Sequence, residues 1–178
     1  MRIISGILKG RKINVPSNRW KTRPTTDFAK ESLFNILVNN ISLENINVLD
    51  LFSGTGSVAF EFVSRGAGSV SCVEQYKPCV RFIRDTAQSF NILDKMDIHH
   101  MDVHKYLMKT EKTFDVIFCD PPYHSNYNLL LENLDRSNAC NSQTLIIFEH
   151  DGNNSFEQYN TVIETRTYGQ SRFSFITI

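Results

Sequence analysis

An Asp-Pro-Pro-Tyr tetrapeptide at residues 120–123 constrains the fold more than any other feature, because it directly follows an apolar run over 114–119. Two consecutive prolines fix φ near −65° and remove two backbone donors, so the chain there cannot continue a strand or enter a helix interior. The sequence therefore predicts a stiff loop at the carboxyl end of a strand, the place where open α/β sheets bind their ligands.

The predicted loop holds a carboxylate, a backbone carbonyl and an aromatic ring in one arrangement, contributed by Asp120, Pro121 and Tyr123. Two acceptors and a flat apolar face suit a planar base that carries an exocyclic amino group. An Asp-Pro pair is also common in simple turns. The tetrapeptide alone therefore leaves a capped turn as an even alternative.

Apolar runs typical of buried strands alternate with helical patterns along the chain. We expect strands at 46–52, 69–74, 98–101, 114–119 and 144–148, and helices that begin near 24–27, 58, 78, 103 and 128. The last two strands, near 162–167 and 173–178, are joined by a short link that favours an antiparallel hairpin. This order predicts an α/β fold with a seven-stranded, mostly parallel sheet covered on both faces.

Bulk properties narrow the class of protein. With 178 residues and 41% hydrophobic residues, the chain fits one domain with a proper core, and no apolar run has the length of a signal peptide or a membrane span. The four cysteines form no Cys-x-x-Cys pair, so we expect reduced thiols in a cytoplasmic protein. The side chains of His99, His100 and His104 should diverge, and we expect no metal site.

Positive charge is concentrated at the N-terminus. Residues 1–26 contain seven basic side chains and no acidic one, and since the formal net charge is zero, the rest of the chain is acidic by the same amount. A basic extension on an acidic body favours a nucleic-acid partner, although a solvated tail is the simpler alternative. We expect a short ordered β-ribbon that contacts phosphates through basic residues: Arg2, Lys9, Arg11, Lys12 and Arg23.

A glycine turn, Gly54-Thr-Gly56, follows the first predicted strand and opens a helix, and Glu74 ends the second strand twenty residues after Gly54. By itself this spacing permits a dinucleotide site. Carboxylates, however, follow four successive strands: Asp50, Glu74, Asp102 and Asp120. Any one of them could be a helix cap. Four at one rim favour a cationic ligand over a diphosphate.

Several segments resemble known methyltransferases. Residues 48–56 look like the first motif of S-adenosylmethionine-dependent methyltransferases, and 120–123 like the loop of those that methylate base amines. Residues 2–6, 9–11, 23–27, 30–37 and 168–169 resemble the bacterial 16S ribosomal RNA guanine-N2 methyltransferase family of the small subunit. That family usually has a basic residue where this chain has Phe28.

The resemblance implies a Rossmann-like class I methyltransferase domain over 24–178, with residues 1–23 as an RNA-contacting extension. It implies S-adenosylmethionine as cofactor and 16S rRNA of an assembling small subunit as substrate, and we expect a monomer. We assign to the cofactor a set of residues at the rim: Asp50, Phe52, Gly54, Gly56, Glu74, Asp102, Val103 and Asp120. Asp120, Pro121 and Tyr123 would serve catalysis.

Three alternatives remain open at this point. The same loop could serve an adenine-N6 methyltransferase, because nothing in it distinguishes the two amines. The glycine turn could belong to an NAD-dependent oxidoreductase. A non-catalytic RNA-binding assembly factor is the third, and the intact tetrapeptide at 120–123 argues against it.

Overall fold

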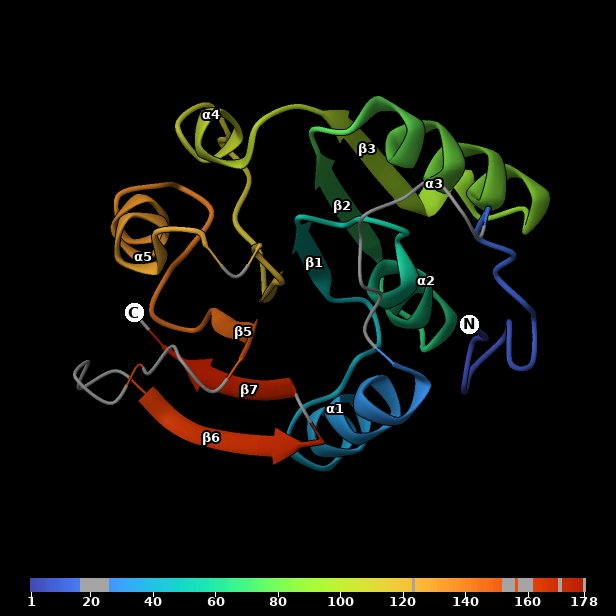
Figure 1. Cartoon of the computed structure of the whole chain (residues 1–178), viewed down its shortest axis with the longest axis horizontal. Coiled ribbons are helices and arrows are strands. Elements are labelled where there is room, and N and C mark those ends of the chain that lie inside the picture. The colour runs from blue at the N-terminus through green and yellow to red at the C-terminus, as the bar shows by residue number, and fades with distance from the viewer. Residues whose placement is uncertain (17–25, 123, 152–155, 157–161, 170, 178) are drawn as a thin grey trace.

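The structure is a computed structural model that describes residues 1–16, 26–122, 124–151, 156, 162–169 and 171–177. Among these residues seven strands form one sheet in the order β3-β2-β1-β4-β5-β7-β6 (Figure 1). The strands are β1 (Asn47–Leu51), β2 (Ser69–Glu74), β3 (Met96–His100), β4 (Val116–Cys119), β5 (Leu145–His150), β6 (Val162–Tyr168) and β7 (Ser171–Ile176). The first five run parallel, and β7 is antiparallel to both β5 and β6. The predicted Rossmann-like α/β fold and its final hairpin are confirmed.

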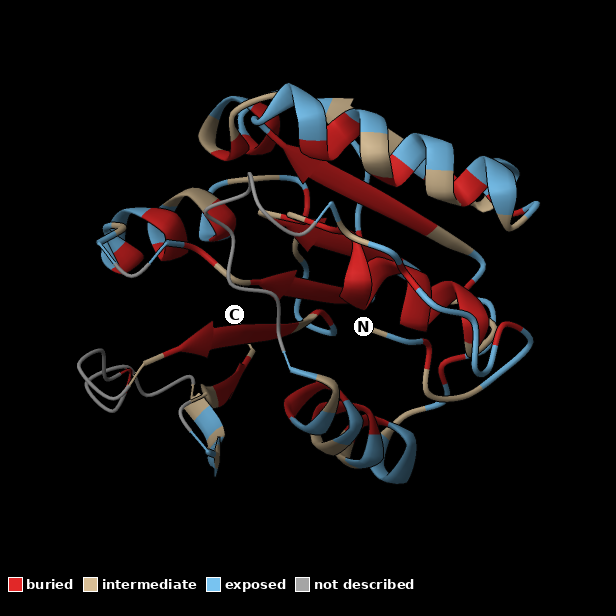
Figure 2. Cartoon of the chain, turned by 45° about the vertical axis from the view of Figure 1, so that its right-hand side comes forward, coloured by how far each residue is buried: buried red, intermediate tan, exposed pale blue. Residues whose placement is uncertain are grey.

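Helices cover both faces of this sheet. They are α1 (Asp27–Asn40), α2 (Ser57–Ser64), α3 (Lys77–Ser89), α4 (Val103–Leu107) and α5 (Tyr127–Asp135). One hydrophobic cluster joins α1, α2 and α3 to one face, and a second joins α4 and α5 to the other. In Figure 2 the helix α2 is buried on all sides, whereas α1 and α3 also expose residues to solvent. The core is therefore two layers separated by the sheet.

The strand β3 begins at Met96, two residues before the predicted start at 98. Its sequence alternates poorly because it is an edge strand of the described sheet, paired only with β2. Edge strands tolerate polar and charged side chains, which weakens the periodic signal. The predicted start of α1 is confirmed, since the Thr26 hydroxyl caps the helix by accepting a hydrogen bond from Ala29 N at 3.1 Å.

The first thirteen residues form an N-terminal ribbon that packs on α2. Arg2 and Lys12 form an antiparallel bridge, and Ile3 N donates to Arg11 O at 2.9 Å. The side chains of Ile3, Leu8 and Ile13 are buried in the same cluster as α1 and α2. The N-terminal ribbon is thus part of the body of the domain. The expected boundary between residues 23 and 24 lies outside the described residues.

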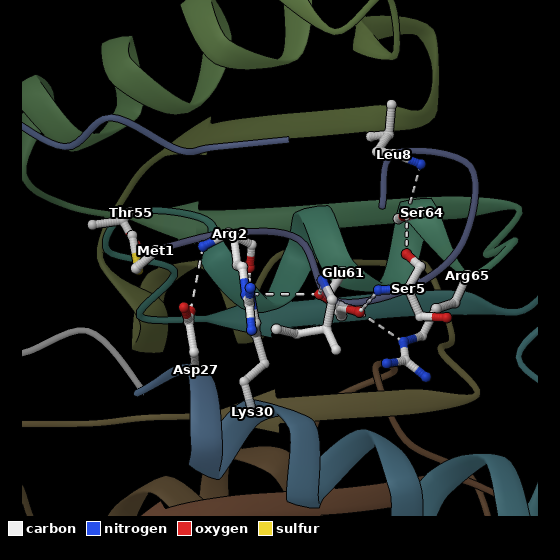
Figure 3. Close-up of polar contacts among 11 residues, drawn as sticks. Met1, Arg2, Ser5, Leu8, Asp27, Lys30, Thr55, Glu61, Ser64 and Arg65 are labelled. Atoms are coloured by element: carbon white, nitrogen blue, oxygen red, sulfur yellow. Dashed lines mark hydrogen bonds and ion pairs between the residues drawn. The ribbon is translucent and has the colours of Figure 1, made fainter. Parts of the chain in front are cut away.

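A fully buried carboxylate on α2, that of Glu61, holds the N-terminal ribbon in place (Figure 3). Its two oxygens accept hydrogen bonds from Ile4 N at 2.8 Å and Ser5 N at 3.1 Å. Arg65, the C-cap residue directly after α2, donates from Nε to the carboxylate at 2.8 Å. A single side chain therefore satisfies two backbone donors of the ribbon.

Lys30 of α1 completes this cluster from the opposite side. Its Nζ lies 3.5 Å from a Glu61 oxygen and donates to Arg2 O at 2.7 Å, and both charged side chains are 0% exposed. Burial lowers the pKa of Lys30, and the neighbouring Glu61 carboxylate opposes that shift. The ion pair joins α1, α2 and the N-terminal ribbon into one unit.

We expect Glu61→Ala to lower the free energy of unfolding by roughly 3–5 kcal/mol, because it leaves the Lys30 ammonium buried without its counter-charge. Urea denaturation measures this loss. The matched control is Asp85→Ala, which breaks an ion pair with Arg81 whose side chains are 65% and 84% exposed. That change should cost at most about 1 kcal/mol. Equal losses in the two variants would show that the buried cluster has no special role.

Candidate active site

A tight glycine loop connects β1 to α2 at the carboxyl edge of the sheet. Gly54 and Gly56 have φ of 52° and 73°, a region that favours glycine. Gly56 N donates to Ser53 O at 2.7 Å, and a Cβ at Gly56 would lie 3.0 Å from Ile83 Cγ1. Phe52 also has a positive φ, 61°, which is unusual for a bulky residue. The loop is thus closely fitted against α3 at Gly56, and its positive φ angles favour glycine at both positions.

Glu74, at the end of β2, braces this loop from the side. Its carboxylate accepts hydrogen bonds from Gly54 N at 2.9 Å and from Tyr76 N at 2.7 Å. The predicted proximity of Glu74 to the glycine turn is therefore present in the structure. Each carboxylate oxygen retains acceptor capacity for a ligand hydroxyl.

Asp50 lies deeper than an open rim position, with an exposed fraction of only 2%. Burial raises the pKa of Asp50 to about 8, although a hydrogen bond from the Ala59 backbone at the start of α2 opposes the shift. Its Oδ2 has no hydrogen-bond partner among the described residues, and the same holds for the Ser57 hydroxyl on the first turn of α2. Buried polar atoms are normally paired. These two atoms make the glycine loop suited to a ligand with polar groups.

Asp102 and Val103 follow β3 at the same edge. Asp102 caps α4 by accepting a hydrogen bond from Lys105 N at 3.1 Å, so one of its oxygens has a structural role. Val103 is buried at the start of α4. Met101 N donates to Glu74 O at 3.1 Å, which ties this segment to the end of β2. Both predicted residues therefore adjoin the Glu74 side of the glycine loop.

Asp120 lies next to the glycine loop on its other side. The strand β4 ends at Cys119, immediately before the Asp-Pro-Pro segment as predicted, and Cys119 pairs with Leu51 of β1. Asp120 N is 3.5 Å from Leu51 O, so the half-buried Asp120 lies beside Phe52. Pro121 is buried, whereas Tyr123 lies outside the described residues. The structure therefore brings the proline loop and the glycine loop together on adjacent strands.

The basic residues of the N-terminal ribbon face solvent. Arg2, Lys9, Arg11 and Lys12 are all exposed, and Arg23 lies outside the described residues. The guanidinium of Arg11 lies 5.1 Å from the centre of the Phe90 ring, so Arg11 makes a cation–π contact within the protein. The exposure of these cations is compatible with phosphate contact, and the contact itself stays a prediction.

Sequence reasoning missed one contact of the site. Thr55, inside the glycine loop, directs its hydroxyl at the Met1 sulfur at 3.8 Å. The N-terminal ribbon therefore reaches the loop itself. No local pattern signals this contact, because the two residues are far apart in sequence and neither belongs to a recognisable motif.

The three histidines considered as metal ligands have separate partners. His99 lies 3.1 Å from Asp97, His100 bonds a backbone carbonyl, and His104 bonds Asn133. Within the described ranges no group of three or more His, Cys, Asp or Glu side chains could hold a metal ion. In the same residues no helix combines the length and apolarity needed to cross a membrane.

Comparison with known proteins places this site in context. The family described as "Conserved hypothetical protein 95" matches residues 1–177. The chain is 32% identical over 157 residues to "Ribosomal RNA small subunit methyltransferase D" of Buchnera aphidicola subsp. Baizongia pistaciae, a match that covers 85% of this chain and 76% of the relative.

Solved structures share the fold. "Putative methyltransferase yhhF from Escherichia coli" superposes with a TM-score of 0.84 at 23% identity, over 99% of this chain and 97% of the other. "SMU.776, a putative methyltransferase complexed with SAH" gives a TM-score of 0.68 at 17% identity, over 86% of this chain and 50% of the other. At these identities the likeness concerns the fold.

The raised pKa of Asp50 predicts a pH-dependent stability. Because the folded protein binds a proton that the unfolded chain releases above about pH 4, the stability contributed by Asp50 falls as pH rises toward its folded pKa of about 8. Between pH 5 and 7 the free energy of unfolding should fall by up to about 1.4 kcal/mol per pH unit because of Asp50. The variant Asp50→Asn should lack this contribution. Urea unfolding of both proteins across this range measures the difference. Parallel curves would contradict a protonated Asp50.

Proposed function

We propose that this chain, which belongs to the family described as "Conserved hypothetical protein 95", transfers a methyl group from S-adenosylmethionine to the N2 amine of a guanine in 16S rRNA. The broader statement, an rRNA methyltransferase, rests on the family and on the relative named as a small-subunit rRNA methyltransferase. The observation that carries the proposal is the position of Asp120 beside the glycine loop, one residue beyond the β4–β1 pairing.

The residues around the glycine loop fit S-adenosylmethionine. When bound, the cofactor supplies an electrophilic methyl group on a positively charged sulfur. Glu74 would accept hydrogen bonds from the ribose hydroxyls, while Asp102 and the Val103 backbone would bind the adenine. The unpartnered Oδ2 of Asp50 is an acceptor placed for an amino group, and Gly54 and Gly56 permit close approach. Phe52 would pack against the cofactor from the adjoining turn.

Asp120 and Pro121 would act on the substrate amine. The lone pair of an exocyclic amine is delocalised into the base, which makes the nitrogen a poor nucleophile. If the Asp120 carboxylate and the Pro121 carbonyl accept its two N–H bonds, the lone pair is directed at the methyl group, and charge-assisted hydrogen bonds are the stronger kind. Methyl transfer would form the C–N bond as the S–C bond of the cofactor breaks, and Asp120 would accept the proton that the methylated nitrogen then loses. Tyr123 would stack on the base.

The setting of the reaction follows from the same proposal. The substrate would be 16S rRNA, within an assembling small subunit, and the enzyme would act as a monomer in the cytoplasm. Four free cysteines, three of them buried, suit a reducing compartment. A target guanine that is paired must leave its stack first, at a cost of a few kcal/mol.

Two bases compete for this site, because an adenine N6 amine offers the same pair of N–H donors. Nucleoside analysis by mass spectrometry of rRNA treated with the enzyme separates N2-methylguanine from N6-methyladenine. Methylated adenine alone would reject the guanine proposal while leaving the methyltransferase intact. A titration with NADH tests the oxidoreductase alternative, and binding of NADH in place of S-adenosylmethionine would reject methyl transfer altogether.

Asp120→Asn should lower methyl transfer to small-subunit rRNA by at least a hundredfold, because the neutral amide loses the charge-assisted hydrogen bond. Binding of S-adenosylmethionine, measured by calorimetry, should stay within threefold of the unmodified protein. The matched control is Glu74→Gln, which removes charge from the cofactor side and should weaken cofactor binding instead. Activity of Asp120→Asn within tenfold of the starting enzyme would contradict the assigned role.

RNA binding should be strongly salt-dependent. We expect about four or five basic side chains of the N-terminal segment to contact phosphates. The logarithm of the association constant should then fall with the logarithm of salt concentration at a slope of roughly −3 to −5. Filter binding between 50 and 200 mM salt measures the slope. Replacing Lys9 and Lys12 with Gln should make it shallower by about 1–2. A slope near zero would remove the N-terminal ribbon from the RNA interface.

A further inference from the structure

Phe28 is a large aromatic residue that the fold leaves in solvent. It lies in the first turn of α1 and is 64% exposed. Its ring meets that of Tyr168 edge to face, with centroids 6.3 Å apart and an interplanar angle of 73°. Tyr168 in turn lies 6.3 Å from the ring of Phe173, which is fully buried. A row of three rings thus connects the core to an exposed aromatic surface.

This pair lies on the same edge of the sheet as Asp120. The strand β6 is antiparallel to β7, which is antiparallel to β5, so β6 ends at the edge where β4 and β5 end. Tyr168 is the last residue of β6, and in Figure 1 the arrowhead of β6 ends beside α1. The order β4-β5-β7-β6 separates the ends of β4 and β6 by three strand spacings, about 14 Å. One bound RNA segment could therefore reach from the end of β4 to the end of β6.

The backbone at Phe28 is held by its surroundings, and its ring touches that of Tyr168. Thr26 caps the turn that contains it, and the Ser32 hydroxyl donates to Phe28 O at 2.9 Å. An edge-to-face contact leaves ring surface open for a further flat partner. A rigid aromatic group loses little conformational entropy when a ligand stacks on it. Val38 is also exposed on α1, but it lies near the other end of the helix and has no aromatic ring.

Positive charge adjoins the aromatic pair. Arg2 N donates to the Asp27 carboxylate at 3.3 Å, which places the N-terminal ribbon next to Phe28. Residues 1–26, which precede Phe28 in sequence, contain seven basic side chains and no acidic one. Arg166 is two residues before Tyr168 on the same face of β6, where it pairs with Glu164. Stacking surface beside backbone-binding cations is the combination found in single-strand nucleic-acid sites.

We propose that Phe28, supported by Tyr168, stacks on an unpaired base of the RNA that flanks the target nucleotide. This inference rests on the proposed function, because it takes the partner to be RNA. Single-stranded RNA fits better than a protein partner, since one exposed ring pair next to exposed cations offers a flat face and phosphate contacts but no extended apolar area. The N-terminal ribbon and the ring pair then form one continuous RNA surface that ends at Asp120.

The test compares aromatic and non-aromatic side chains at position 28. Phe28→Ala should weaken binding of a 16S rRNA transcript by about five- to 150-fold, the range for one stacked base. Phe28→Leu should lose as much, because it keeps apolar volume without a flat face, and Phe28→Trp should bind as well as the starting protein. Val38→Ala is the matched control on α1 and should change nothing. Filter binding in the Asp120→Asn background isolates binding from turnover, and thermal unfolding checks that the variants fold.

The outcomes separate this inference from the proposed function. Methyl transfer by the starting enzyme together with unchanged RNA affinity in Phe28→Ala would overturn the stacking role alone. Equal affinity of Phe28→Leu and the starting protein would also overturn it, in favour of plain apolar contact. If the starting protein neither binds nor methylates the transcript or small-subunit particles, the proposed function fails and the stacking role fails with it.

Discussion

The arrangement of the site depends on the hydrogen bonds and ion pairs of one buried carboxylate, that of Glu61. A charge with no solvent exposure is stable only when it is paired and fully hydrogen-bonded. Glu61 meets this condition only if the N-terminal ribbon supplies its backbone donors, α1 supplies Lys30, and the C-cap of α2 supplies Arg65. Losing any one of these partners leaves a charge or a polar group unsatisfied in the core. The three segments therefore form a single unit, although they are far apart in sequence.

This unit adjoins the glycine loop. Gly56 is the N-cap of α2, so the helix that carries Glu61 also begins at the loop proposed to hold the cofactor. The N-terminal ribbon reaches the loop again through Met1 and Thr55. The N-terminal ribbon is therefore connected to the glycine loop twice, through the buried contacts of Glu61 on α2 and through Met1.

Sequence reasoning predicted the strands and the final hairpin well because these depend on local signals. The prolines after Cys119 and the glycines after Phe52 each limit the backbone within a few residues, and parallel strands then bring their ends to one edge. The ion pair of Lys30 and Glu61 could not be predicted, since both side chains lie on helices where exposed charges are the usual case. The depth of Asp50 was also missed: the sequence shows an acid at a strand end, and only the packing of α2 determines that it is buried.

The state of Asp50 bears on the kind of ligand that the rim prefers. With a pKa raised to about 8 by burial, Asp50 carries a proton at neutral pH in the folded protein. A cation bound beside it would favour the ionised carboxylate, so binding would release a proton and gain a buried ion pair together. An anionic group such as a diphosphate would instead keep Asp50 neutral and meet the carboxylate of Glu74 nearby. Two carboxyl groups this close to the glycine loop therefore favour a positively charged group over an anionic one.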